Sequence, residues 1–276
     1  MSNTKKIGLV AGNRRLPFQF ADWAKRNGYD LYVIGIKGEV DEKLKNEVSP
    51  KNYTELFVCD LSKGIQFFKE NGVVDVVMIG GIARAKLKIN LDIIKVAFRL
   101  MFLKNKHKGL FTIIMSIINK NGIKIRSIQE FMTELLIGDG CLGSVKPSDD
   151  DLTAFQKNWN TILDYIKTGE GQAVVIYNSE ILAYENFKGT DDLMRRAAEK
   201  RKELGGDSGG IMVKIMEPKQ DERVDLPVVG TGTIETLAKY RLDGVIVEAG
   251  RAITDDTTDT IKIANEKGIF VYGAKI

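Results

Sequence analysis

The sequence predicts an α/β protein of two domains, of which the first carries a mostly parallel sheet. The chain has 276 residues, roughly twice the length of a typical domain. Hydrophobic residues make up 43% of it, and 41 basic residues nearly balance 37 acidic ones. Short apolar runs alternate with helical patterns, with glycine-containing turns between them. These features exclude a disordered chain, collagen and a disulfide-rich scaffold.

Strand and helix patterns alternate through the first half of the chain. The apolar run at 6–10 predicts a buried strand, and Pro17 begins a helix that Gly28 ends. Further elements are predicted as strands at 31–36, 56–58 and 73–79 and a helix at 64–71. Strands that alternate with helices and short turns form parallel sheets, so this half predicts a Rossmann-like domain.

A basic amphipathic helix is predicted at 84–108. This segment has eight Lys or Arg residues and a single acid, Asp92, with apolar residues at helical spacing. Such a helix attracts anionic lipid surfaces, although an ordinary core helix with a solvated rim has the same pattern. A second apolar helix is predicted at 110–118.

The turn and helix N-cap signals after Pro147 place the domain boundary there, which gives an N-terminal domain at 1–147 and a C-terminal domain at 148–276. The second domain also alternates strands and helices, without a detectable repeat of the first. Its predicted elements are helices at 152–167, 191–204, 233–240 and 256–267, a hairpin at 173–177 and 181–184, and strands at 210–216, 245–247 and 270–272.

The scarcity of histidine and cysteine narrows the chemistry. His107 is the single histidine and lies between two lysines, so a Ser-His-Asp triad and a His-ligated zinc are not expected. Cys59 and Cys141 are far apart in the sequence and form no zinc or redox motif. If the protein is an enzyme, then carboxylates, lysines, backbone amides or a magnesium ion carry its chemistry.

No apolar run reaches the roughly 18 to 20 residues that span a bilayer, and the first apolar run is too short for a signal peptide. We therefore expect a cytoplasmic protein, with peripheral attachment to the inner membrane left open. The net charge of +4 is concentrated in one predicted helix, so nucleic-acid binding is not expected. A homodimer is compatible with the sequence.

Two glycine turns end strands of the first domain. Ala11 and Gly12 follow the first strand, and Gly80 and Gly81 end another. The carboxyl ends of parallel strands meet at one edge, so both turns could form the floor of one nucleotide-phosphate site. Each could instead be a tight turn and nothing more. The spacing matches neither a dinucleotide fingerprint nor a Walker loop.

A charged loop follows the 210–216 strand of the second domain. Asp221 and Asp225 could hold a hard cation through oxygen ligands, while Lys214 and Lys219 could contact phosphate. A charged loop is also commonly just a solvated surface. Spacing alone does not decide which of the two aspartates would bind metal.

Two further positions are candidate substrate contacts. Glu248 and Arg251 follow the 245–247 strand, where they could bind substrate or form a structural ion pair. Thr190 precedes the 191–204 helix, where it could cap the helix or help bind an anion.

At these motifs the chain resembles the LpxI-type UDP-2,3-diacylglucosamine pyrophosphatases. The resemblance covers nearly the whole sequence and is strongest from Glu185 onward. The matching segments are IGLVAG at 7–12, LP at 16–17, Glu185 with GTD at 189–191, VK at 213–214, PKQD at 218–221, RVDLPVVG at 223–230 and VEAGR at 247–251.

The resemblance implies a magnesium-dependent enzyme of lipid A biosynthesis. It implies two α/β domains that enclose UDP-2,3-diacylglucosamine between them and hydrolyse it to UMP and 2,3-diacylglucosamine 1-phosphate. It places the essential aspartate of the RVDLP motif at Asp225, and it implies that water attacks the sugar-side phosphorus. Magnesium and an aspartate can perform this chemistry without histidine.

Two other functions stay open. One is a hydrolase of a different UDP-sugar, which the basic residues at 106–108 favour because the family pattern has acids there. The other is a non-catalytic protein that binds a sugar nucleotide.

Overall fold

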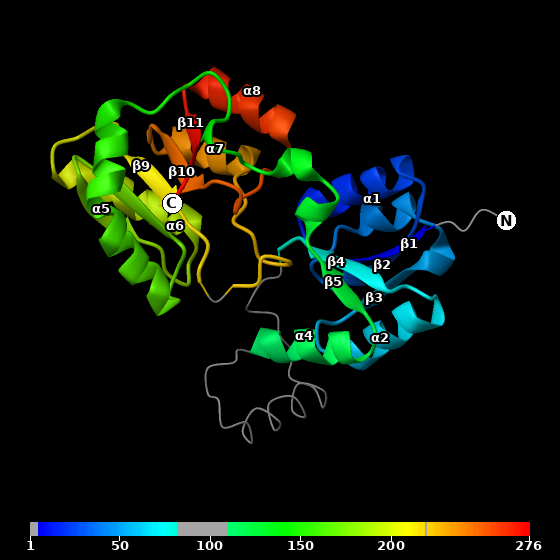
Figure 1. Cartoon of the computed structure of the whole chain (residues 1–276). Helices are drawn as coiled ribbons and strands as arrows, with labels where there is room; N and C mark the ends of the chain where they lie inside the picture. Colours follow the sequence, from blue (N-terminus) through cyan, green and yellow to red (C-terminus); the bar gives the residue numbers. More distant parts are fainter. Residues whose placement is uncertain (1–4, 82–109, 219) are drawn as a thin grey trace, which may run out of the picture. The chain divides into compact units, whose positions relative to one another are not determined.

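The computed structural model describes residues 5–81, 110–218 and 220–276 (Figure 1). The chain divides into two compact units, Met1–Met132 and Thr133–Ile276. The helix predicted at 84–108, with His107, lies outside the described residues. None of the helices described here is long and apolar enough to cross a membrane.

The first unit has a five-stranded sheet in the order β3-β2-β1-β4-β5, and every neighbouring pair is parallel. Its strands are β1 (Lys5–Ala11), β2 (Tyr29–Ile36), β3 (Tyr53–Leu56), β4 (Asp75–Ile79) and β5 (Lys124–Arg126). Its helices are α1 (Leu16–Arg26), α2 (Leu61–Glu70) and α4 (Leu110–Lys120), with short 3₁₀ helices at Glu42–Glu47, Pro50–Asn52 and Ile128–Glu130. This arrangement confirms the predicted Rossmann-like sheet.

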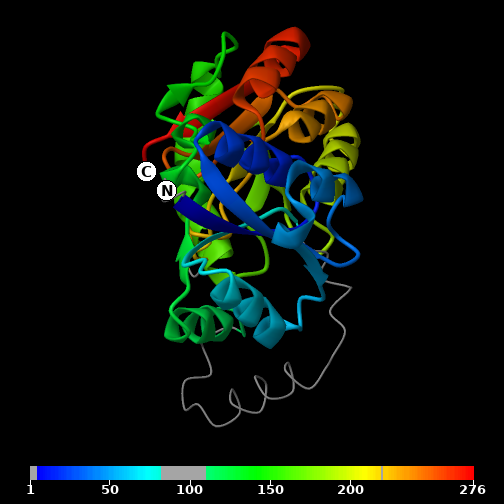
Figure 2. The same ribbon diagram turned by 90° about the vertical axis from the view of Figure 1, so that its right-hand side faces the viewer.

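Helices cover both faces of this sheet, with α1 on one face and α2 and α4 on the other (Figures 1 and 2). On the α1 face Phe20, Trp23 and Phe131 form an aromatic cluster with ring centroids 5.3–5.9 Å apart. Burial on both faces explains why the central strand β1 reads as a continuous apolar run instead of an alternating pattern.

The second unit has a six-stranded sheet in the order β6-β11-β10-β9-β7-β8. Its strands are β6 (Gly140–Cys141), β7 (Ala173–Tyr177), β8 (Glu180–Tyr184), β9 (Ile211–Lys214), β10 (Gly244–Glu248) and β11 (Phe270–Ala274). Strands β9, β10 and β11 are parallel, and antiparallel strands flank them on both sides. Its helices are α5 (Asp149–Thr168), α6 (Thr190–Glu203), α7 (Thr231–Lys239) and α8 (Thr257–Lys267), with a 3₁₀ helix at Thr133–Leu135.

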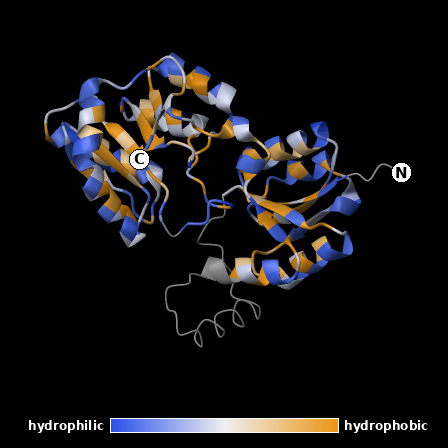
Figure 3. Cartoon of the chain, in the orientation of Figure 1, coloured by the Kyte–Doolittle hydropathy of each residue, from blue (hydrophilic) through white to orange (hydrophobic). Residues whose placement is uncertain are grey.

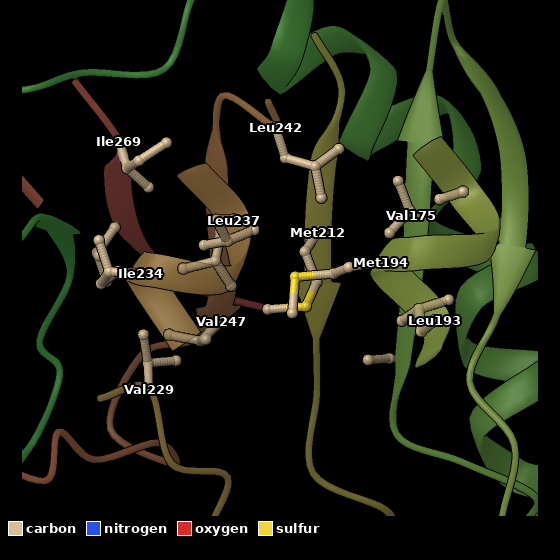
Figure 4. Packing of buried hydrophobic residues seen from close by; sticks show 14 of the residues in the cluster. Val175, Leu193, Met194, Met212, Val229, Ile234, Leu237, Leu242, Val247 and Ile269 are labelled. Atoms are coloured by element: carbon tan, nitrogen blue, oxygen red, sulfur yellow. The ribbon is translucent and has the colours of Figure 1, made fainter. Parts of the chain in front are cut away.

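Two hydrophobic clusters fill this unit. In one, Leu193 and Met194 of α6 pack with Met212 of β9 and Leu237 of α7 (Figure 4). The other includes Phe155 of α5 with residues of the sheet strands. Hydrophobic residues concentrate on the strands and on one side of each helix (Figure 3), as burial of an amphipathic face requires.

The domain boundary lies earlier in the chain than the position predicted at 147. The units meet between Met132 and Thr133, and Gly140 and Cys141 form β6, which pairs antiparallel with β11. Such a two-residue edge strand has no sequence pattern of its own, so the capping box of Ser148 and Asp151 at the start of α5 gave the stronger signal.

The predicted hairpin at 173–184 is confirmed. The strands predicted at 56–58 and 210–216 have different bounds in the structure. Strand β3 covers Tyr53–Leu56 because its ladder with β2 begins at Tyr53, not at residue 56. Strand β9 ends at Lys214, where its pairing with β10 stops.

A buried guanidinium joins helix α6 to two backbone segments of the second unit, 207–209 and 240–241. Arg201 of α6 is 2% exposed and donates to the carbonyls of Gly209 at 2.6 Å, Tyr240 at 2.8 Å and Arg241 at 3.1 Å. A longer bond of 3.3 Å reaches the carbonyl of Asp207. Burial lowers the pKa of this guanidinium. The carbonyls replace the water that the charge loses.

We expect Arg201→Met to lower the free energy of unfolding of the second unit by about 2–3 kcal/mol, because the carbonyls of Gly209 and Tyr240 lose their charged donor. Urea denaturation measures the change. The matched control is Arg195→Met on the same helix, where Arg195 forms ion pairs with Asp192 and Glu199 on a partly exposed surface. This control should cost less than about 1 kcal/mol, and equal losses would contradict the assigned role of Arg201.

Candidate functional site

The two predicted glycine turns lie side by side at the carboxyl edge of the first sheet. Ala11 is buried and pairs with Ile79 at the ends of β1 and β4. The N–H of Gly12 donates to the carbonyl of Ile79 at 2.9 Å, and the N–H of Asn13 donates to that of Gly81 at 2.9 Å. The two turns therefore lie at one sheet edge, as the sequence predicted, and their backbones are in direct contact.

This contact requires glycine. A Cβ added at Gly12 would lie 2.4 Å from the carbonyl oxygen of Gly81, and one added at Gly80 would lie 2.7 Å from that of Asn13. Gly80 also has a φ of +95°, which L side chains rarely adopt. The sheet order reverses between β1 and β4, and ligands of open parallel sheets bind at such a switch point.

The loop after β1 continues this polar edge. Arg14 has a φ of +77°, a conformation that costs a non-glycine residue about 1–3 kcal/mol and is frequent at functional sites. The side-chain amide of Asn13 donates to the carboxylate of Glu39 at 3.0 Å. The sequence interpretation missed Glu39, although an acid shortly after the second strand of a parallel sheet is a recognisable signal.

Lys214 lies at the carboxyl end of β9, and its side chain is largely buried. The residue is 8% exposed, and its ammonium donates to the carbonyl of Val228 at 3.3 Å. The segment around Val228 is fixed to Ile253, whose N–H donates to Pro227 at 2.9 Å and whose carbonyl accepts from Val229 at 2.9 Å. The charged loop after β9 therefore returns to the end of that strand.

Asp221 and Asp225 occupy different environments within this loop. Asp221 accepts from the backbone N–H of Arg223 at 3.1 Å and from its Nε at 2.8 Å, and Arg223 Nη2 contacts its second oxygen. This guanidinium lowers the pKa of Asp221. Asp225 donates its N–H to the carbonyl of Asp221 at 3.1 Å, and its side chain is exposed. The turn thus engages Asp221 with Arg223 and presents Asp225 to solvent.

Arg251 connects this loop to the end of β10. Its Nη1 lies 3.0 Å from Glu248, and its Nε donates to Glu222 at 2.9 Å. Glu248 and Arg251 thus form the ion pair that was one of their two predicted roles, and Arg251 reaches a second carboxylate that the sequence interpretation missed. Their role as substrate contacts stays a prediction.

Thr190 points toward the interior of its own unit. Its hydroxyl donates to Glu185 at 2.7 Å, and Glu185 also accepts from the N–H of Gln172 at 2.9 Å. Glu185 is 8% exposed. No side-chain hydrogen bond caps α6, which has Gly189 at its N-cap. Lys219, another predicted phosphate contact, lies outside the described residues.

Within the described residues, no group of three or more His, Cys, Asp or Glu side chains could hold a metal ion. Arg223 engages both oxygens of Asp221, one of the two predicted metal ligands. Magnesium, however, is often bound by one or two carboxylates together with substrate phosphates and water. The exposed carboxylate of Asp225 fits that mode of binding.

The fold and its strand-end loops define a two-domain α/β protein with polar groups at the carboxyl edge of each sheet. The model of the LpxI N-terminal domain matches residues 6–135, and that of the LpxI C-terminal domain matches residues 138–272. The chain therefore belongs to the LpxI family. The junction between the two matches falls close to the boundary between the structural units.

A curated relative supports this assignment. The chain is 27% identical over 276 residues to the UDP-2,3-diacylglucosamine pyrophosphatase LpxI of Caulobacter vibrioides, with 98% of this chain and 97% of the relative covered. A solved structure, the biotin carboxylase domain dimer of Hydrogenobacter thermophilus 2-oxoglutarate carboxylase, matches 73% of this chain and 42% of its own at 13% identity. Its TM-score of 0.27 is too low to support an argument.

We expect Gly12→Ala to destabilise the first unit by about 1–3 kcal/mol, because the added methyl meets backbone that cannot rotate away. The matched control is Gly64→Ala in α2, where a Cβ would make ordinary contacts of 3.4 Å or more. The control should be neutral or stabilising by up to about 1 kcal/mol, since alanine favours helix. Urea denaturation and hydrogen exchange of the sheet amides measure both, and equal effects would contradict the close contact.

The ion pair of Asp221 and Arg223 predicts a pH-dependent stability. Because the pKa of Asp221 is lowered in the folded state, its contribution is present above the unfolded pKa and is lost as pH falls through the folded value. Asp221→Asn should therefore cost up to about 1 kcal/mol at pH 7 and nothing in acid. Urea titrations across this range test it, and a difference that persists in acid would contradict it.

Proposed function

We propose that this protein hydrolyses the pyrophosphate bond of UDP-2,3-diacylglucosamine to give UMP and 2,3-diacylglucosamine 1-phosphate, a step of lipid A biosynthesis. The observation that carries the proposal is the match of both LpxI domains along the chain. The relative from Caulobacter vibrioides, named for this substrate, supports it over nearly its full length. Since the substrate is a lipid, we also propose that the protein works at an anionic membrane surface.

In the proposed reaction, the oxygen of water bonds to the sugar-side phosphorus. The bond from that phosphorus to the bridging oxygen breaks, and UMP leaves with the electron pair. Hydrolysis of this kind depends mainly on positioning and on neutralising phosphate charge. A sequence with one histidine can therefore support it.

Asp225 is the proposed catalytic residue. Its exposed carboxylate follows a turn that is closed by its own backbone N–H and by the contacts between Asp221 and Arg223. We propose that Asp225 orients the attacking water and holds magnesium jointly with the substrate phosphates. When bound, magnesium would neutralise phosphate charge and polarise the water.

Asp221 has a different proposed role. Its pairing with Arg223 makes it a residue that positions the turn, whereas the sequence left open which aspartate binds metal. Lys214 supplies a cation at the carboxyl end of β9, and we propose that it and Lys219 neutralise phosphate charge. Glu248 and Arg251 hold the loop to the end of β10.

The first unit has a complementary proposed role. Its floor at Gly12, Gly80 and Gly81 places backbone without side chains at the switch point of the sheet. Such a floor lets a phosphate approach the backbone closely. We propose that it binds the nucleotide half of the substrate.

We expect Asp225→Asn to lower kcat by at least about 100-fold, since the substitution removes the charge that orients water and metal. Asp221→Asn is the matched control, because the same chemical change four residues earlier should lower kcat by less than about tenfold. Phosphorus NMR of the wild type with UDP-2,3-diacylglucosamine and magnesium should resolve both products, and EDTA should stop their formation.

Reaction in oxygen-18 water tests the site of attack. The label should enter the sugar 1-phosphate and not UMP. No turnover by folded wild-type protein would refute the proposed function and direct the search to other UDP-sugars, beginning with UDP-N-acetylglucosamine.

A further inference from the structure

Glu39 lies in a tight turn at the carboxyl end of β2. The N–H groups of Glu39 and Val40 both donate to the carbonyl of Ile36 at 2.9 Å, and that of Lys37 donates to Leu56 at 2.9 Å. These bonds tie the turn to the ends of β2 and β3. The carboxylate is therefore held by a fixed backbone at the sheet edge that carries the glycine floor.

Asn13 links Glu39 to that floor. Its backbone pairs with Gly81 at the end of β4, while its side-chain amide donates to Glu39 at 3.0 Å. A Cβ added at Gly81 would lie 2.6 Å from Asn13 Oδ1. The Asn13 side chain therefore extends from Gly81 to Glu39, and one polar edge runs from β4 across β1 to β2.

The order of the strands shows on which side of the glycine floor Glu39 lies. The glycine floor is at the switch point between β1 and β4, and β2 is the neighbour of β1 on the other side. A nucleotide whose phosphates lie on such a floor directs its ribose toward the end of β2, where an acidic residue can accept bonds from the sugar hydroxyls. Oε2 of Glu39 accepts from Asn13, and a carboxylate oxygen has lone pairs for a further hydrogen bond from a ribose hydroxyl.

We propose that Glu39 accepts hydrogen bonds from the ribose hydroxyls of the bound nucleotide, so that the first unit selects ribonucleotides over 2′-deoxyribonucleotides. This inference rests on the proposed function, because it assigns the nucleotide half of the substrate to the first unit. Glu39 would then be a specificity-determining residue, and its hydrogen bond with Asn13 holds it beside the glycine floor.

The test measures binding of UDP and of 2′-deoxy-UDP to the full chain by calorimetry. A hydrogen bond to a charged group contributes enough that the wild type should bind UDP about tenfold or more tightly than 2′-deoxy-UDP. In Glu39→Gln this ratio should fall below about threefold, and in Glu39→Ala it should approach one. The change should come from weaker UDP binding, with the affinity for 2′-deoxy-UDP nearly unchanged.

Glu42→Gln is the matched control, because Glu42 is exposed three residues further on and should keep the wild-type ratio. Thermal unfolding of each variant shows that it is folded. A purely structural role of Glu39 would weaken binding of both nucleotides equally and leave their ratio unchanged.

Hydrolysis of UDP-2,3-diacylglucosamine by the same wild-type preparation separates the two proposals. Turnover without discrimination between the nucleotides, or with a ratio that Glu39→Gln leaves unchanged, overturns the role of Glu39 and leaves the proposed function standing. Discrimination that depends on Glu39 without turnover supports the nucleotide site and refutes the proposed reaction.

Discussion

The parallel pairing of strands determines where each unit can place functional groups. In the first unit, β1 and β4 end in register, so Gly12 meets Gly80 and Gly81 with no side chain between them. In the second unit, Lys214 pairs with Val247, which puts the last residue of β9 beside the end of β10, where Glu248 lies. In each unit these groups come from residues that are distant in sequence, and the strand pairing brings them to one edge of that unit's own sheet. The strand pairing therefore determines where the loops begin and where their side chains can lie.

The ion pairs around the charged loop fix the position of the loop and contribute little to the free energy of folding. Arg251 is 37% exposed at its side chain, and Glu222 is 47% exposed, so solvent screens much of their attraction and the pair contributes little free energy. Its effect is geometric, because one guanidinium is held between the end of β10 and a loop residue 29 positions earlier. A turn stabilised in this way presents Asp225 without burying it.

The sequence predicted what local patterns encode. Periodicity and turn signals indicated the buried strands, the helix termini and the hairpin, and they placed the glycines of two strand ends at the same sheet edge. The contact of Arg251 with Glu222 and the burial of Arg201 depend on tertiary packing, which no local pattern records. Strand β6 is two residues long and exists because β11 offers it a free edge. The position of Glu39 after the second strand is a local signal, but its contact with Asn13, a residue from another strand end, is not.

The roles proposed for Asp221 and Asp225 would let a chain with one histidine hydrolyse a pyrophosphate. A carboxylate engaged on both oxygens by a guanidinium has little capacity left for a metal or a water. Asp225, four residues later, is exposed, and its backbone N–H donates to the carbonyl of Asp221. The RVD sequence at 223–225 therefore contains both the arginine that binds Asp221 and the proposed catalytic aspartate. Arg223 engages Asp221 and holds the turn, and Asp225 is the proposed catalytic residue.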